Sequence, residues 1–365
     1  MQFPFRDILT AQNKSYAAHT PEAMDDILDC SLGVNPYGFP AEVAQAVGGF
    51  DPELLSAYPH SHVLHEALCD YFPGLTPEEI TLANGSVCGL YYLNNIFSMT
   101  ERSQVVGFVP SFTDMVESVK CFGMTYLGVP LRLEENGEGQ VRDLIAAITD
   151  KTAFLYLDRP NNPTGQAMAL PDVEKLLQAA QSAGCYVLVD EAYGDFLPRE
   201  DSAMTLWGKY DNLIVLRTFS KGFGLANLRC GYIAAPRDLT AMMARTTNPY
   251  LLSDMERAIC AQALRYPDHP TAHAADFAAV KQAIRTSIGK KLQMLCTDDR
   301  VPICTLCAPQ GVDLQRELLQ CGVLTVSGRE FDALDERFVR LRIPPASQVD
   351  KLLSAIARVE ASSHR

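Results

Sequence analysis

Short apolar runs alternate with amphipathic stretches through the middle of the chain. From residue 124 to residue 219 their order is MTYLGVPL, VRDLIAAI, TAFLYLD, VEKLLQAAQSAG, CYVLVDE and LIVLRTF. Short continuous apolar runs are typical of strands buried on both faces, and the stretches between them have the periodicity of helices. The alternation predicts an α/β fold with a mostly parallel sheet and helices on both of its faces.

The pattern also divides the rest of the chain. Residues 80–97 predict a strand, a glycine turn and a helix, and residues 104–112 predict another buried strand. After residue 247, the stretches 248–265 and 272–295 predict two long helices.

A compact set of strands and helices follows these long helices, and it ends in a helix over 348–360. In this set VLTVS is predicted as one strand and RFVRLRI as another. We therefore predict an N-terminal arm (1–40), a large domain (41–247) and a small C-terminal domain (248–365).

Composition and charge restrict the possible partners and the compartment. The chain has 365 residues, of which 47% are hydrophobic and 21% charged, as in ordinary soluble enzymes. Its net charge of −13 argues against nucleic acid or an anionic membrane as the main partner. Residues 80–100 carry no charge, but their asparagines argue against a membrane span. Eleven cysteines without CxxC spacing, and no secretory signal at MQFPFRDILT, predict reduced thiols and a cytoplasmic protein.

Three polar motifs follow apolar runs, at the ends of predicted strands where ligands gather in parallel sheets. They are RPNNPTG (159–165), VDEAYGDF (189–196) and SKGFGLANLRCG (220–231). The third places Lys221 just after the hydroxyls of Thr218 and Ser220, with Arg229 eight positions beyond. An amine near hydroxyls and an arginine is typical of a Schiff-base lysine beside a phosphate.

Other interpretations remain for individual motifs. Gly222 and Gly224 suggest a dinucleotide loop, but Asn227 stands where the third glycine of GxGxxG belongs. Taken alone, Lys221 would be a surface lysine in a glycine-rich turn. A zinc site at His60, His62 and His65 lacks a further ligand at suitable spacing, so no metal is predicted.

In combination and in this order, NNPTG, DEAY and SK with an arginine at +8 resemble class I/II aminotransferases. These are pyridoxal-phosphate (PLP) enzymes of fold type I, and the chain is most similar to the branch that contains histidinol-phosphate aminotransferase and threonine-phosphate decarboxylase. The resemblance extends over most of the chain. It implies a large domain with a mostly parallel seven-stranded sheet, a small α/β domain, PLP as cofactor and a homodimer with shared active sites.

The resemblance also implies roles for individual residues. Lys221 would carry PLP and act as the general base, and Asp190 would keep the pyridine nitrogen protonated. Asn162 and Tyr193 would contact the phenolic oxygen. Phe112 would stack on the ring, although it could instead be an ordinary core residue. The residues implied at the phosphate are Ser86, Val87 (through its backbone only), Thr218, Ser220, Arg229 and Tyr58 from the neighbouring subunit.

The expected substrate contacts follow the family less closely. Arg340 and Arg342 share one face of a predicted strand, and counting back from the last helix favours Arg340 for the substrate carboxylate. Asn35, in the turn-rich SLGVNPYGFP, would lie at the mouth of the site. Val326 stands where this branch has a phosphate-binding arginine, which argues against a phosphorylated substrate. Arg329, three positions later, is a candidate to replace that arginine, and Arg159 is a candidate to face an acidic group of the substrate.

The expected activity is transfer of an amino group from an amino acid to a keto acid. PLP labilises whichever bond at Cα is held perpendicular to its ring, so decarboxylation is the main alternative, and elimination or cyclisation is another. A PLP-binding regulator is a further class, but the chain has neither the length for an added DNA-binding domain nor a basic patch.

Overall fold

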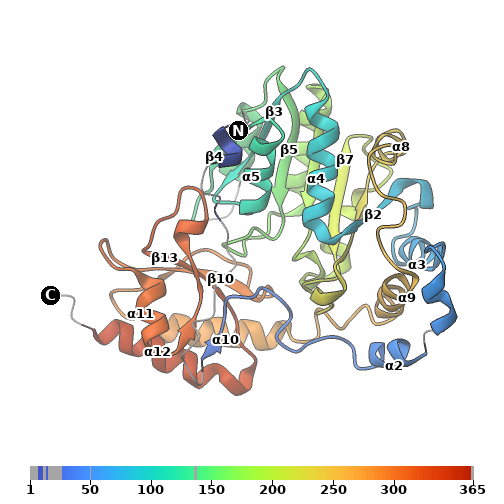
Figure 1. Cartoon of the computed structure of the whole chain (residues 1–365). Helices are drawn as coiled ribbons and strands as arrows, with labels where there is room; N and C mark the ends of the chain where they lie inside the picture. Colours follow the sequence, from blue (N-terminus) through green and yellow to red (C-terminus); the bar gives the residue numbers. More distant parts are fainter. Residues whose placement is uncertain (1–6, 11–13, 15–26, 50, 135–137, 363–365) are drawn as a thin grey trace, which may run out of the picture.

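A seven-stranded sheet forms the centre of the larger part of the molecule (Figure 1). The computed structural model describes residues 7–10, 14, 27–49, 51–134 and 138–362. The strands, in spatial order, are Ile80–Asn84 (β2), Cys230–Ala234 (β8), Leu213–Thr218 (β7), Tyr186–Asp190 (β6), Thr152–Asp158 (β5), Gln104–Val109 (β3) and Thr125–Pro130 (β4). Only β8 runs antiparallel to its neighbours, so the predicted mostly parallel sheet is confirmed.

Both faces of this sheet are buried by helices. Along β5, Phe154 and Tyr156 belong to one hydrophobic cluster, whereas Leu155 and Leu157 belong to another on the opposite face. This is the alternation that a strand imposes on successive side chains. It explains why β5 reads as a continuous apolar run in the sequence.

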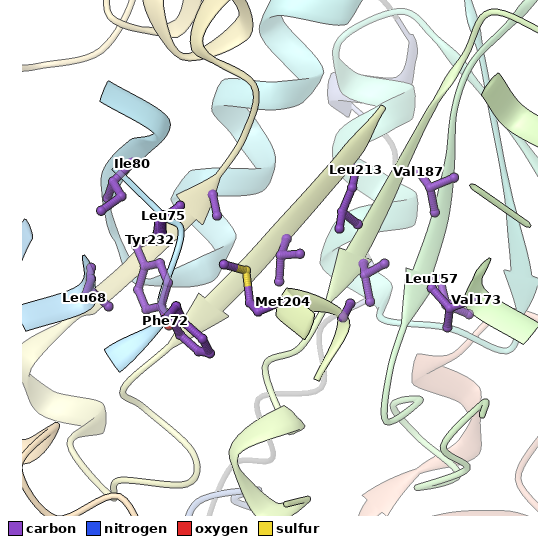
Figure 2. Close-up of a cluster of buried hydrophobic side chains, with 14 of the residues drawn as sticks. Leu68, Phe72, Leu75, Ile80, Leu157, Val173, Val187, Met204, Leu213 and Tyr232 are labelled. Atoms are coloured by element: carbon purple, nitrogen blue, oxygen red, sulfur yellow. The ribbon is translucent and has the colours of Figure 1, made fainter. Parts of the chain in front are cut away.

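Figure 2 shows the second of these clusters. Leu157, Val187 and Leu213 come from three adjacent strands, and Val173 lies beside them. The helices of the larger part are Val43–Gly48 (α2), Val63–Tyr71 (α3), Gly85–Ser98 (α4), Thr113–Cys121 (α5), Glu138–Ala146 (α6), Leu170–Ser182 (α7), Arg237–Met243 (α8) and Asp254–Ala263 (α9). A four-residue helix, Asp7–Thr10 (α1), precedes them in the chain.

A smaller α/β unit lies beside the large sheet (Figure 1). Its four-stranded antiparallel sheet has the order β12-β13-β10-β9, and a separate parallel pair joins β1 to β11. These strands are Val326–Ser327 (β12), Phe338–Arg342 (β13), Ile303–Cys307 (β10), Gln293–Met294 (β9), Leu28–Asp29 (β1) and Val323–Leu324 (β11). The helices of the unit are Ala274–Ser287 (α10), Leu314–Gln320 (α11) and Val349–Ala361 (α12). The segment between β1 and α2 therefore runs from the small unit to the large one.

Three element predictions were wrong in extent. The helix expected over 248–265 is α9 and begins only at Asp254, where Ser253 and Glu256 form a capping box. The helix expected over 272–295 is α10 and ends at Ser287, because Ile288 takes up an extended conformation. The single strand expected for VLTVS is divided into β11 and β12, which belong to different sheets.

The predicted domain boundaries stay predictions. Residues 1–6, 11–13 and 15–26 of the expected N-terminal arm lie outside the described residues. α9 follows the expected boundary at residue 247, yet it packs against α2 and α3 of the larger part. Among the described helices none is both long and apolar enough to cross a membrane.

Candidate active site

Lys221 lies just beyond β7, at the edge of the sheet where the parallel strands end. The Lys221 carbonyl accepts hydrogen bonds from the backbone N–H groups of Asn35 (3.0 Å) and Gly224 (3.1 Å), which hold the turn. The Lys221 ammonium lies 5.9 Å from the centre of the Tyr193 ring. Burial lowers the pKa of Lys221 to about 8, and the nearby charges of Arg340 and Arg229 act in the same direction. A neutral amine is therefore accessible near neutral pH, as a nucleophile or general base requires.

A cavity of about 640 Å³, including the space at its open mouth, surrounds this amine. The residues that line it are Ser86, Val87, Phe112, Asp158, Pro160, Asn162, Asp190, Ala192, Tyr193, Ser220, Lys221 and Arg229. Nine of these were predicted from the sequence, and they come together from several strand ends and the start of α4.

One end of the cavity is built to receive an anion. Ser86 and Val87 lie in the first turn of α4, a fourteen-residue helix whose N-terminus presents free N–H groups and positive potential. The Arg229 guanidinium packs against Gly85 at the same turn, and its Nη1 donates to the Ser220 hydroxyl (3.3 Å). The positive N-terminus of α4 and the Arg229 guanidinium therefore lie side by side, and an anion bound between them would stabilise both.

Gly85 makes this approach possible. Its φ of +75° favours glycine, and a Cβ at this position would collide with the Arg229 guanidinium. Thr218 does not line the cavity, but its hydroxyl donates a hydrogen bond to the Ser220 hydroxyl (3.0 Å), which does. The donor set is therefore suited to a phosphate group.

The lining of the cavity also includes a carboxylate at the end of β6. Asp190 accepts a hydrogen bond from the Tyr156 hydroxyl (2.9 Å) and another from the Ala192 backbone (3.0 Å). Burial raises the pKa of Asp190 to about 7 in the absence of a ligand. A protonated ring nitrogen beside this carboxylate would supply the cation that a buried carboxylate requires. With Phe112, Asn162 and Tyr193 on the walls, the residues fit PLP.

The two candidate substrate arginines have different surroundings. Arg340 is almost completely buried, donates to the Asn162 side-chain oxygen (3.1 Å) and also donates to the Ser31 carbonyl. Arg342 donates instead to the carbonyls of Asp29 and Ile343. The structure thus brings Arg340, and not Arg342, into contact with a residue of the cavity.

Asn35 lies beside the site, but its side chain is already engaged. The Asn35 amide donates to the Gly222 carbonyl (2.9 Å) and accepts from the Tyr37 backbone N–H (3.0 Å). In this arrangement it anchors the mouth segment to the turn that contains Lys221.

Two expectations about additional substrate arginines were wrong. Arg159 donates to the Met168 carbonyl (2.6 Å) and pairs with buried Glu191 (3.5 Å), so it does not face the cavity. Arg329 is largely exposed and pairs with Glu336 (3.3 Å). The strand position opposite Arg340 is occupied by buried Val326.

Tyr58 lies away from the cavity of its own chain. Its side chain is 75% exposed, and its ring lies 4.6 Å from that of Tyr250. No group of three or more His, Cys, Asp or Glu side chains suited to a metal ion occurs in the described part of the chain.

Asp158 is the main cavity residue that sequence reasoning missed. It ends the buried strand β5, as Asp190 ends β6, and the two are paired in register. A carboxylate that ends a fully apolar run requires buried partners. This signal was visible in TAFLYLD.

Comparisons with known proteins show which family this chain resembles. The family model described as aminotransferase class I and II matches residues 25–356. A histidinol-phosphate aminotransferase from Thermococcus gammatolerans is 31% identical over 237 residues, which are 64% of this chain and 66% of the relative. The match thus spans just under two thirds of that relative's length.

Solved structures show the same fold. L-threonine-O-3-phosphate decarboxylase from Porphyromonas gingivalis superposes with a TM-score of 0.79 at 18% identity, covering 92% of this chain and 100% of that one. A histidinol-phosphate aminotransferase from Sinorhizobium meliloti, in complex with pyridoxal-5'-phosphate, superposes with a TM-score of 0.76 at 22% identity. This superposition covers 91% of the present chain and 90% of the Sinorhizobium meliloti chain.

Proposed function

Because this chain belongs to the aminotransferase class I and II family, we propose that it is a PLP-dependent aminotransferase that moves an amino group from an amino acid to a keto acid. Its architecture is that of fold type I. One observation carries the proposal: Lys221 and Asp190 line the same cavity as Ser86 and Arg229, the residues suited to bind a phosphate.

The residues that would hold PLP are those of the cavity. Lys221 would bind it covalently, and the N-terminus of α4 with Arg229 and Ser220 would bind its phosphate. Phe112 would cover the ring, and Asp190 would pair with the protonated ring nitrogen. When bound, PLP withdraws electrons from the carbon that carries the substrate's amino group.

The protein's own groups then act on the substrate. Arg340 binds the substrate carboxylate, since a guanidinium offers two parallel donors to a carboxylate. With the substrate amine in place of Lys221 on the bound cofactor, the freed Lys221 Nζ would take up the proton of the substrate's Cα and release it again. A pKa of about 8 suits both directions of this transfer, because the amine can gain and lose a proton near neutral pH.

The substrate we propose is an amino acid without a phosphate. Val326 lies opposite Arg340 across β12 and β13, and Arg329 is turned toward Glu336. Arg340 is taken by the substrate carboxylate in this proposal. A substrate phosphate beside Val326 would therefore be buried without a cation of its own, at a cost of several kcal/mol.

Product analysis with the PLP-loaded protein tests both points. We expect keto acid from one or more amino acids, with sustained turnover only when a keto acid acceptor is added. Release of carbon dioxide or of ammonia in its place would assign the protein to decarboxylation or elimination. Faster turnover of histidinol phosphate than of any unphosphorylated substrate would contradict the proposed substrate class. The matched control is Lys221→Ala, which should form no covalent adduct that borohydride can reduce.

We also propose a homodimer in which Tyr58 reaches the neighbouring active site. Leu55, Tyr58 and Tyr250 are more than half exposed, an unusual set of large apolar side chains for a surface that stays free. Neither Tyr58→Ala nor Lys221→Ala alone can supply a complete site. Mixed dimers of the two should regain activity, because one site then combines Lys221 of one chain with Tyr58 of the other. No gain on mixing would contradict shared sites.

A reducing compartment, the cytoplasm, is the location that we propose. All eleven cysteines are free in the structure, including the buried Cys30 and Cys304. Burial raises the pKa of both thiols, to about 12 for Cys30 and about 11 for Cys304, which keeps them protonated and unreactive.

A further inference from the structure

Asp158 is a buried carboxylate in the cavity to which the proposed chemistry gives no role. It is only 5% exposed and lies beside Asp190 at the ends of two adjacent parallel strands. One such carboxylate is sufficient for a ring nitrogen. The second must therefore be explained by its contacts.

These contacts join two loops that follow different strands. One Asp158 oxygen accepts the backbone N–H groups of Phe112 (3.2 Å) and Asn162 (3.0 Å). The other accepts from the Asn161 amide (3.0 Å), which also donates to the Pro110 carbonyl (3.1 Å). A single carboxylate thus connects the Pro110–Phe112 loop after β3 to the Asn161–Asn162 turn after β5.

A carboxylate is matched to this arrangement, because every one of these contacts comes from a donor and a carboxylate offers acceptors on both oxygens. The Asn161 amide cannot rotate, because its oxygen accepts from the backbone N–H (3.1 Å) and the hydroxyl (2.6 Å) of Thr164. Its NH₂ group therefore always faces residue 158. An amide at 158 that kept the two backbone hydrogen bonds would point its own NH₂ at that of Asn161, so two donors would meet.

Burial raises the pKa of Asp158 to about 6, and the hydrogen bonds from Asn161, Asn162 and Phe112 oppose this rise. At neutral pH the group is consequently mostly ionised, and its hydrogen bonds are charge-assisted and strong.

We propose that Asp158 is a positioning residue that sets the distance between Phe112, which covers the cofactor ring, and Asn162, which contacts the ring edge. The inference rests on the proposed function, since it assumes that PLP occupies the cavity. Asp158 acts through the two loops, by holding their backbones in one relative position.

The test is Asp158→Asn, with two measurements made on the PLP-loaded protein. One is the dissociation constant of PLP. The other is the visible circular dichroism of bound PLP at saturation, which reports how the ring is held. We expect the dissociation constant to rise roughly 10- to 100-fold, as for the loss of charge-assisted hydrogen bonds. We also expect the dichroism per bound PLP to change, while borohydride still fixes PLP to Lys221.

Asn212→Ala is the matched control. Asn212 is also buried and bridges two backbone carbonyls, those of Leu177 and Cys185, but it precedes β7 at the opposite end of the sheet. Its loss should lower the melting temperature and leave the dichroism of saturated protein unchanged. This separates an effect on the site from general destabilisation.

The outcomes are distinct. Wild-type affinity and dichroism in Asp158→Asn would overturn the inference and leave the proposed function intact. Absence of any covalent adduct in the wild-type protein would overturn both. If Asp158→Asn does not fold, Asn161→Ala removes one of the three donors. In that variant a several-fold weaker affinity with altered dichroism supports the inference, and unchanged values overturn it.

Discussion

The ionisation of Lys221 offers the sharpest test of the site. In the cofactor-free protein, burial lowers its pKa from 10.5 to about 8, assisted by the charges of Arg340 and Arg229. A decrease of this size raises the neutral fraction at pH 7 by roughly 300-fold, since each pKa unit is a factor of ten. Only the neutral amine attacks an aldehyde. The rate of PLP attachment should therefore level off above about pH 8, and not near the ordinary lysine value of about 10.4.

The two arginines of β13 provide the perturbation and its control. Arg340→Met removes a buried positive charge near Lys221 and should move the midpoint of the rate profile upward by up to about one pH unit. Arg342→Met also removes a positive charge, but the Arg342 guanidinium donates to the Asp29 carbonyl and is not among the charges that lower the pKa of Lys221. This variant should therefore leave the midpoint unchanged. Stopped-flow absorbance after mixing cofactor-free protein with PLP, from about pH 6 to about pH 11, gives the midpoint of each profile.

Two results would refute this reasoning. A wild-type midpoint near 10 would mean that Lys221 is not desolvated. Equal shifts in the two arginine variants would mean that Arg340 has no special proximity to the amine. The second result would also remove the basis for assigning the substrate carboxylate to Arg340.

Three further predictions concern stability and the anion site. Burial raises the pKa of Asp190 from 3.8 to about 7, so its contribution to stability is complete below about pH 4 and is lost as pH rises through about 7. The melting temperature of the cofactor-free protein should then fall more steeply between about pH 4 and about pH 7 than that of Asp190→Asn, and equal slopes would contradict this. Glu191→Gln leaves the buried Arg217 without one of its two carboxylates, and urea unfolding should show a loss of about 3–5 kcal/mol. A loss below about 1 kcal/mol would mean that Glu191 and Arg217 are not coupled as the structure indicates. Gly85→Ala should cost about 1–2 kcal/mol in backbone strain and displace Arg229, so PLP titration should show weaker binding; unchanged affinity would argue against the anion site.

Much of the fold was accessible from local patterns. The apolar runs TAFLYLD, CYVLVDE and LIVLRTF predicted buried strands, because a strand covered on both faces needs apolar side chains in both directions. In the structure they form the neighbouring strands β5, β6 and β7. The polar motifs after these runs predicted the cavity residues, since parallel strands end at the same edge of the sheet.

Other features had no local signal. The antiparallel direction of β8 depends on its neighbours β2 and β7, and the residues of CGYIA are equally suited to either direction. Arg340 and Arg342 share a strand face by periodicity, and only packing decided that one contacts Asn162 while the other contacts the Asp29 backbone.

The amino-acid order thus determined which elements form, where the strands end and which chemical groups stand at those ends, because turn chemistry and periodicity act over a few residues. The tertiary structure alone decided which of these groups meet. Asp158 binds the backbone of Phe112, 46 positions away, and Arg340 binds Asn162, 178 positions away. Contacts of this kind depend on strand register and domain packing, which residues close in sequence do not encode.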